Sequence, residues 1–145
     1  MPTIIKRLEI DAGHRVLRHE SKCANVHGHR YAFFIKVYAP ELDSVGRVVD
    51  FSVIKDKVGG WLDENLDHGY IYHPKDTVGE MLKVTGQKVF QMPYKLGEPT
   101  AENLAALVGE ISQELLGEEL TVVSVQCQET PTSVAEWVKE DADKI

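Results

Sequence analysis

The sequence predicts an α+β fold, in which an antiparallel sheet carries helices on one face. Segments with period-two alternation lie near both ends of the chain, and a segment with helical spacing of its apolar residues lies between Thr100 and Gly117. The expected order is strand, strand, helix, a mixed middle, helix, strand, strand. A chain of 145 residues that is 43% hydrophobic is long enough for one globular domain, residues 1–145.

Two long strands are expected in the N-terminal part of the chain. Residues 4–14 and 27–37 alternate apolar with polar side chains, and the polar, basic stretch 15–26 between them is expected to be a loop. His27 and His29 begin a face that continues with aromatic and β-branched residues. In the first strand, the residues that share the apolar face are Leu8, Ile10, Ala12 and His14.

Shorter elements are expected in the rest of the chain. Asp50 or Ser52 suits the N-cap of the next helix. Gly59 and Gly60 lower the helix propensity in the middle of that helix. Because an uncovered sheet face and free strand edges need a partner, an oligomer is expected. The expected elements are a turn-rich link at 41–46, a short strand at 47–51, helices at 53–62, 76–84 and from Thr100 to Gly117, and strands at 88–92, 120–129 and 134–138.

Charge, hydropathy and cysteine content exclude several classes of protein. The chain carries 16 Lys and Arg against 23 Asp and Glu, a net charge of −7 that disfavours general binding to nucleic acids. No apolar run approaches the ~18 residues of a membrane-spanning helix, and the N-terminus lacks the apolar region of a signal peptide. Two cysteines cannot form a disulfide scaffold. A cytoplasmic protein without nucleic-acid or membrane partners is expected.

Three histidines are candidate metal ligands. His27 and His29 are separated by one residue on a strand, so both imidazoles point to the same side and can approach one ion. The alternative is that they are ordinary residues of a mostly apolar face. His14 favours the metal site, because a histidine on the apolar face of a neighbouring strand needs a polar partner. Three protein ligands leave zinc one open position for water or substrate.

Cys23 and the pair Asp67–His68 are candidates for proton transfer. Cys23 precedes the paired histidines, where it is either the fourth ligand of a closed structural zinc site or a thiolate beside an open one. Asp67 directly precedes His68, and a carboxylate beside an imidazole can orient it and stabilise its charge. The alternative for this pair is two surface residues at a helix end.

Three more residues are candidates for binding a substrate. Glu129 ends the strand at 120–129, and its carboxylate suits the paired N–H donors of a guanidine-like heterocycle edge. The alternative is an exposed charge at a strand end. Thr100 suits a helix cap, and Glu102 in the first turn suits the helix dipole. For these two residues the helix-capping role and a binding role remain equally open.

Six short segments, each weak alone, occur in an order that is specific as a set. On these residues the chain resembles the 6-pyruvoyltetrahydropterin synthase / 6-carboxytetrahydropterin synthase family. The resemblance implies the tunnelling fold (T-fold), with a four-stranded antiparallel sheet, helices on one face, and homo-oligomers (hexamers or tetramers) built as β-barrel rings with active sites between subunits. The segments are Ile10–Arg15, Lys22–Tyr31, Gly46–Phe51, Leu66–His68, Pro99–Leu104 and Glu129–Thr130.

The resemblance also implies a task for each candidate residue and a substrate, 7,8-dihydroneopterin triphosphate. Basic residues around the metal loop are expected to hold the triphosphate, namely Arg15, Arg18, Lys22 and Arg30. The implied set is one Zn²⁺ per subunit held by His14, His27 and His29, the catalytic thiol of Cys23, the proton-relay pair Asp67 and His68, and a pterin pocket with Glu129, Thr100 and Glu102.

The spacing from Cys23 to His27 favours one branch of that family. The favoured branch forms 6-carboxy-5,6,7,8-tetrahydropterin, releases acetaldehyde and triphosphate, and feeds queuosine-type 7-deazapurine biosynthesis. The pyruvoyl-forming branch, usually with a longer segment here, is the alternative, and a non-catalytic zinc-stabilised ring protein is an alternative of another class. Residues 69–98 are longer than in compact members, so this segment is expected to cover the pocket or alter assembly.

Overall fold

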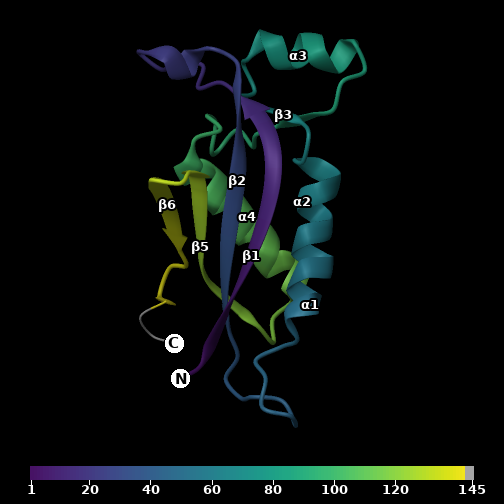
Figure 1. The fold of residues 1–145 in the computed structure, drawn as a ribbon, viewed down its shortest axis with the longest axis vertical. Coiled ribbons are helices and arrows are strands. Elements are labelled where there is room, and N and C mark those ends of the chain that lie inside the picture. The colour runs from purple at the N-terminus through teal and green to yellow at the C-terminus, as the bar shows by residue number, and fades with distance from the viewer. Residues whose placement is uncertain (143–145) are drawn as a thin grey trace.

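The computed structural model describes residues 1–142 and contains a single six-stranded sheet with the order β4-β3-β1-β2-β5-β6 (Figure 1). Neighbours among β1, β2, β5 and β6 pair antiparallel, whereas β3 pairs parallel with both β1 and β4. The expected four-stranded antiparallel sheet is therefore corrected to a mixed sheet of six strands. The strands are β1 (Thr3–His14), β2 (His27–Tyr38), β3 (Tyr70–Tyr72), β4 (Val89–Gln91), β5 (Thr121–Thr130) and β6 (Ser133–Val138).

The two parallel strands belong to the segment 69–98, which we call the inserted segment. Strands β3 and β4 have three residues each, too short for an alternating pattern to show in the sequence. Only Tyr70 and Ile71 of β3 pair with β1, and they lie opposite Gly13 and His14. The helix and the strand predicted inside this segment are confirmed, whereas strand β3 was not predicted.

The predicted strand at 47–51 is wrong. Residues there form turns before a helix, because Asp43 accepts hydrogen bonds from both the backbone and the guanidinium of Arg47 (both 2.9 Å). Asp50 then caps the helix by accepting from Ser52 N at 2.8 Å, as one of the two predicted caps. The helix continues without a break through α1 (Phe51–Ile54), the π-helical turn η2 (Lys55–Gly59) and α2 (Gly60–Asn65).

Two further helices follow, one at an end of the molecule and one against a face of the sheet. Figure 1 shows α3 (Thr77–Val84) at the end of the molecule where β1 finishes, and α4 (Ala101–Leu116) behind the sheet. Helix α4 begins at its cap Thr100 and ends where Gly117 adopts a positive φ of 84°, a conformation that suits glycine. Among the described residues, no helix is long and apolar enough to cross a membrane.

The core lies between one face of the sheet and the helices α4 and α1–α2. The buried faces of β1, β2 and β5 pack there in one apolar cluster with both helices, as the alternation predicts. Central members of the cluster are Phe33, Ile35, Val125, Leu62, Leu104 and Val108. Histidines complete this buried face at the ends of β1 and β2, so the same alternation that forms the core also gathers them.

Candidate active site

Three histidines meet where β1 ends and β2 begins. In the antiparallel register His14 lies opposite His27, and His29 lies opposite Ala12. One ligand atom from each of the three histidines lies within 4.8 Å of the others, and His14 is almost fully buried. This cluster contains the three residues that the sequence predicted as ligands.

Backbone carbonyls orient two of these imidazoles. His14 Nδ1 donates to Pro99 O at 2.8 Å, and His27 Nδ1 donates to Asn25 O at 2.7 Å. Since each Nδ1 carries its proton, each neutral ring presents a lone pair at Nε2, and these two atoms lie 3.1 Å apart. Two facing lone pairs repel unless a cation lies between them. The donor set therefore fits a metal such as Zn²⁺, which binds neutral imidazole nitrogen.

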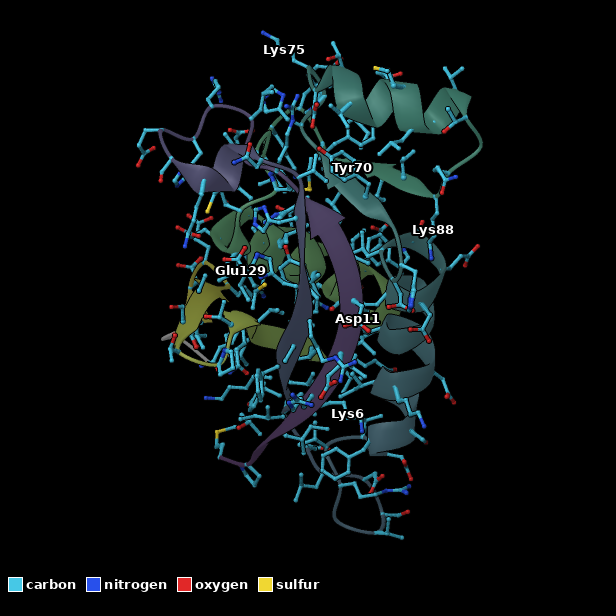
Figure 2. All side chains as sticks on the ribbon, turned by 45° about the horizontal axis from the view of Figure 1, so that its top comes forward. Lys6, Asp11, Tyr70, Lys75, Lys88 and Glu129 are labelled. Carbon is cyan, nitrogen blue, oxygen red and sulfur yellow. The ribbon has the colours of Figure 1, made fainter. Side chains whose placement is uncertain are left out.

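Glu129 adds a negative charge to the histidine cluster. Its Oε1 lies 3.2 Å from Nε2 of both His14 and His29. The close contact with His14 lowers the pKa of the Glu129 carboxyl and outweighs the effect of burial. Glu129 also lines a hollow of about 250 Å³ with Glu102 and residues of β6. Glu129, labelled in Figure 2, lies near the end of β5, and because it contacts two of the histidines and lines this hollow, it stands between the cluster and the hollow.

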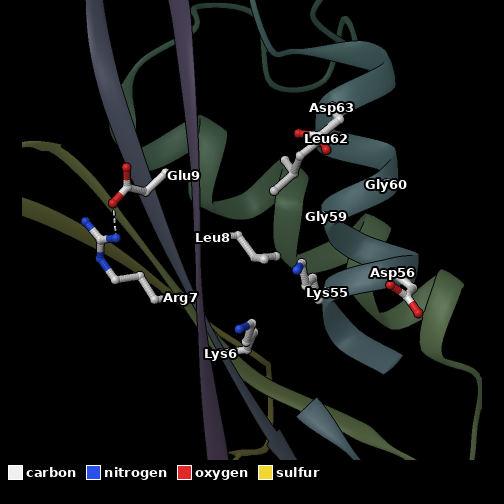
Figure 3. A pocket seen from close by; sticks show the side chains of 10 residues that line it. All are labelled: Lys6, Arg7, Leu8, Glu9, Lys55, Asp56, Gly59, Gly60, Leu62 and Asp63. Atoms are coloured by element: carbon white, nitrogen blue, oxygen red, sulfur yellow. Dashed lines mark hydrogen bonds and ion pairs between the residues drawn. The ribbon is translucent and has the colours of Figure 1, made fainter. Parts of the chain in front are cut away.

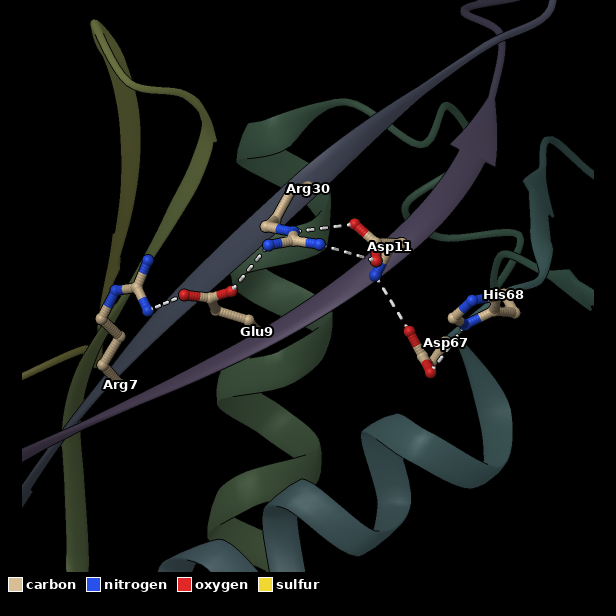
Figure 4. Close-up of polar contacts among 6 residues, drawn as sticks. All are labelled: Arg7, Glu9, Asp11, Arg30, Asp67 and His68. Carbon is tan, nitrogen blue, oxygen red and sulfur yellow. Dashed lines mark hydrogen bonds and ion pairs between the residues drawn. The ribbon is translucent and has the colours of Figure 1, made fainter.

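Asp67 and His68 follow α2 and lie beside the C-terminal part of β1, next to Asp11 (Figure 4). His68 Nδ1 donates to Asp67 Oδ2 at 2.9 Å, and Asp11 N donates to Asp67 Oδ1 at 2.9 Å. Burial raises the pKa of Asp67, but these hydrogen bonds outweigh it and hold that pKa below its usual range. His68 adopts a positive φ of 58°, which a hydrogen bond from its N–H to Asp11 O supports.

A second hollow lies between His29 of the cluster and His68. It measures about 480 Å³ and is lined by His29 and Gly28 on one side and by His68 on the other. Gly28 has no side chain, and a Cβ there would lie 3.3 Å from Ala12 O. One predicted metal ligand, His29, and one residue of the predicted relay pair, His68, therefore line the same hollow.

Cys23 lies in the short helix η1 (Lys22–Ala24) of the loop 15–26, which we call the basic loop. Its side chain is half-buried, and its carbonyl accepts from Val16 N at 2.8 Å. Within residues 1–142, the side chains grouped closely enough to hold a metal are the three histidines, without Cys23. This geometry does not support the reading in which Cys23 closes a structural site.

Thr100 and Glu102 occupy the start of α4. Thr100 Oγ1 accepts from Asn103 N at 3.2 Å, which is the helix-cap role considered from the sequence. Glu102 is exposed in the first turn and lines the hollow that Glu129 also lines. The structure thus places Glu102 beside a candidate pocket and gives Thr100 a structural role.

The arginines expected to hold a triphosphate lie against carboxylates. Arg15 contacts Asp76 at 2.6 Å, and Arg30 contacts Asp11 at 3.1 Å. Figure 4 shows Arg30 within a row of charges on the exposed sheet face that also contains Arg7 and Glu9. The sequence alone does not reveal Asp76 and Asp11 as partners of these arginines, nor the carbonyls that orient the histidines. Backbone carbonyls leave no signal in a sequence, and Asp76 resembles an ordinary helix cap.

Another hollow, of about 420 Å³, lies between the first half of β1 and α1–α2 (Figure 3). Its walls carry charges of both signs, including Lys6, Lys55 and Asp63, and no histidine or cysteine. This hollow lies along the part of β1 away from His14, so it is separate from the histidine cluster at the other end of the strand.

The geometry agrees with comparisons of the whole chain. A family model described as 6-pyruvoyl tetrahydropterin synthase matches residues 3–140. The chain belongs to this family. Relatives named 6-carboxy-5,6,7,8-tetrahydropterin synthase are 43% identical in Rickettsia bellii, covering 90% of this chain and 96% of the relative, and 33% identical in Bacillus subtilis, covering 88% and 79%.

Solved structures show the same fold for this member of the family. An uncharacterized protein from Wolinella succinogenes superposes with a TM-score of 0.81 at 22% identity, covering 96% of this chain and 98% of that one. The 6-pyruvoyl tetrahydropterin synthase of Caenorhabditis elegans superposes with a TM-score of 0.70 at 23% identity, covering 96% of both chains. The T-fold expectation is therefore confirmed at the level of the family fold.

Proposed function

We propose that this protein is a 6-carboxy-5,6,7,8-tetrahydropterin synthase. It is a lyase that converts 7,8-dihydroneopterin triphosphate to the 6-carboxy product with release of acetaldehyde and triphosphate, in queuosine-type 7-deazapurine biosynthesis. The observation that carries the proposal is the cluster of three imidazoles beside a hollow that His29 and His68 line, with His68 bonded to Asp67. The named relatives support this branch of the family.

One Zn²⁺ per subunit is the proposed cofactor. It would be held by His14, His27 and His29, because one ring nitrogen of each lies close to those of the other two. Backbone carbonyls fix the orientation of two of these rings, His14 and His27. When bound, zinc supplies a Lewis acid that polarises substrate oxygens and acidifies the neighbouring C–H and O–H groups.

Protons are moved by the side chains of the chain itself. Asp67 accepts from His68 Nδ1, so it fixes the tautomer and leaves Nε2 to exchange a proton with the substrate. Cys23 is the proposed catalytic thiol at the site. Two proton carriers suit a reaction that removes one proton and delivers another.

Glu129 is the proposed anchor for the pterin. Its carboxylate lies at the junction between the histidine cluster and the hollow lined by Glu102. A carboxylate there can accept two N–H donors from the amino-pyrimidinone edge. Thr100 is proposed to contribute to the same pocket by capping the start of α4.

The assembly is proposed to be a cytoplasmic homo-oligomer, a hexamer or tetramer, with active sites between subunits. The His68 side chain is 77% exposed in the isolated chain, which leaves a proton carrier in contact with water. A second subunit over this hollow would exclude water from the chemistry.

The decisive experiment is incubation of the zinc-loaded protein with 7,8-dihydroneopterin triphosphate and identification of the products. Acetaldehyde with a 6-carboxypterin supports the proposal, and a pyruvoyl product reassigns the chain to the other branch. The variant Cys23→Ala is expected to retain zinc while kcat falls by about 10²–10⁴-fold, the range for loss of a proton-transfer group. Loss of zinc and folding together would instead favour a non-catalytic zinc-stabilised ring protein.

A further inference from the structure

The inserted segment contacts the start of the basic loop through directional polar bonds. Glu98 accepts from the backbone N–H groups of Leu17 and Arg18 at 3.0 and 2.9 Å. Asp76 accepts from the side chain of Arg15, the residue after His14. Residues 15, 17 and 18 are therefore all tied to the inserted segment directly after the metal-ligand position.

Asp76 is the centre of these contacts. It is fully buried, and its two oxygens accept from Arg15 Nη2 at 2.6 Å, Arg15 Nε at 3.1 Å, the Tyr70 hydroxyl at 2.7 Å and Val78 N at 3.0 Å. Burial raises the pKa of Asp76, but the bonds from Arg15, Tyr70 and Val78 outweigh it and lower the pKa below its usual range. A buried carboxylate with four donors holds its partners firmly.

These bonds leave Arg15 with a task other than the one expected from the sequence. Two of its guanidinium nitrogens, Nε and Nη2, are used by Asp76. Releasing them to a substrate phosphate would leave a buried carboxylate without its counter-charge, which is costly. Arg15 is therefore held as part of the fold.

The contacts also reach Cys23. Val16, which lies between Arg15 and Leu17, donates its N–H to the carbonyl of Cys23 at 2.8 Å. Since Arg15 and Leu17 are both fixed by the inserted segment, the position of Val16 is fixed from both sides. The backbone that carries the half-buried Cys23 side chain is therefore linked, through Val16, to bonds made by Asp76 and Glu98.

We propose that Arg15 and Asp76 are positioning residues, which fix the basic loop against the inserted segment and thereby hold the Cys23 thiol at the site. The inference rests on the proposed function, because that function gives Cys23 its task. On this inference, the role of the long segment 69–98 is to position the basic loop at the active site.

The test uses two variants and one control. Asp76→Asn preserves the size and the cap acceptor, but it brings an amide NH₂ against Arg15 in place of an acceptor oxygen. Arg15→Lys keeps the charge but loses the paired bonds. Asp43→Asn is the matched control, because Asp43 also accepts from an arginine and from backbone N–H groups, and it is exposed in the turns at 41–50.

Two readouts are measured on each protein. The first is kcat and KM with 7,8-dihydroneopterin triphosphate. The second is the rate at which iodoacetamide alkylates Cys23 in the metal-free protein, followed by mass spectrometry, with the fully buried Cys127 as an internal reference. Far-UV circular dichroism is used to choose an assay temperature at which the wild type and all variants are folded.

In both test variants we expect kcat to fall about tenfold with KM within about twofold of wild type, because misplacement of a catalytic group slows chemistry more than binding. Alkylation of Cys23 is expected to accelerate about threefold or more as the loop is released. The control should match wild type in both readouts.

Other outcomes overturn the inference. If Arg15→Lys raises KM and alkylation stays at the wild-type rate, Arg15 binds the triphosphate. Wild-type alkylation in both variants also refutes the positioning role. If Asp76→Asn does not fold, Arg15→Lys still decides. A wild-type protein without turnover refutes the proposed function, while the alkylation rates still judge the positioning.

Discussion

Helices α3 and α4 begin in the same way and are held in different ways. Asp76 caps α3 by accepting from Val78 N, and Thr100 caps α4 by accepting from Asn103 N. Helix α4 then buries seven residues against the sheet, whereas α3 buries only Gly79.

Two apolar side chains of α3 are exposed, Met81 to 67% and Val84 to 87%, and the other two, Val78 and Leu82, are only half-buried. Its attachments are mainly polar: Asp76 with Arg15 and Tyr70, and Glu80 with the Tyr72 hydroxyl at 2.9 Å. Apolar burial stabilises α4 together with the whole fold, but a few directional bonds place α3. Helix α3 is therefore expected to open without unfolding the rest.

The largest difference should appear when one apolar side chain is shortened in each helix. Leu104→Ala, at a fully buried position of α4, is expected to lower the free energy of unfolding by about 2–5 kcal/mol. Met81→Ala, at an exposed position of α3, should change it by no more than about 0.5 kcal/mol. Urea unfolding followed by circular dichroism measures both, and equal losses would show that α3 is packed like α4.

A glycine in each helix offers a second test. A Cβ at Gly79 would overlap the Tyr72 ring, and a Cβ at Gly109 would overlap the Trp137 ring. Both alanine variants should therefore lose about 1–3 kcal/mol through overpacking. Hydrogen exchange should locate the loss of Gly79→Ala in residues 70–91 alone, and that of Gly109→Ala throughout the described chain.

Gly60→Ala is the control for this pair. A Cβ at Gly60 meets no atom within 4 Å, and its backbone is helical with φ −59° and ψ −44°. This variant should gain about 0.4–1 kcal/mol, because alanine restricts the unfolded chain. Exchange that spreads over the whole protein in Gly79→Ala would mean that α3 and the sheet unfold as one unit.

The same contrast explains what the sequence could predict. Long alternation predicted β1, β2 and β5, and histidines on the buried faces of β1 and β2 led to the cluster of His14, His27 and His29. Thr100 and Gly117 marked the ends of α4 because caps have strong residue preferences. These features depend on residues close in sequence.

The features that were not predicted depend on distant residues or on backbone atoms. Arg15 and Asp76 are 61 residues apart, and each has an ordinary local explanation, as a loop cation and as a helix cap. The carbonyl of Pro99 that orients His14 leaves no trace in its residue type. Strand β3 is defined by pairing with the end of β1, and three residues cannot show a period.

The smallest expected effect is the response of α3 to acid. Because the pKa of Asp76 is lower in the folded protein than in the unfolded chain, its contribution is fully present above the unfolded pKa of about 4 and is lost as pH falls through the folded pKa. Protonation removes the charge that holds Arg15 and weakens the acceptor for the Tyr70 hydroxyl. Exchange of the α3 amides, corrected for the intrinsic pH dependence, should therefore accelerate below about pH 4. The cap of α4 is the neutral Thr100, so the start of that helix should show no matching change.

Asp76→Asn separates this effect from general acid unfolding. An amide cannot titrate, so the variant should exchange faster at pH 7 and lose the additional acceleration on acidification. Asp43→Asn should keep the wild-type response of α3, since Asp43 lies exposed in turns at the other end of the β1–β2 pair. If Asp76→Asn retained the full acid response, another carboxylate would be holding α3, and Glu80 on the Tyr72 hydroxyl would be the next residue to substitute.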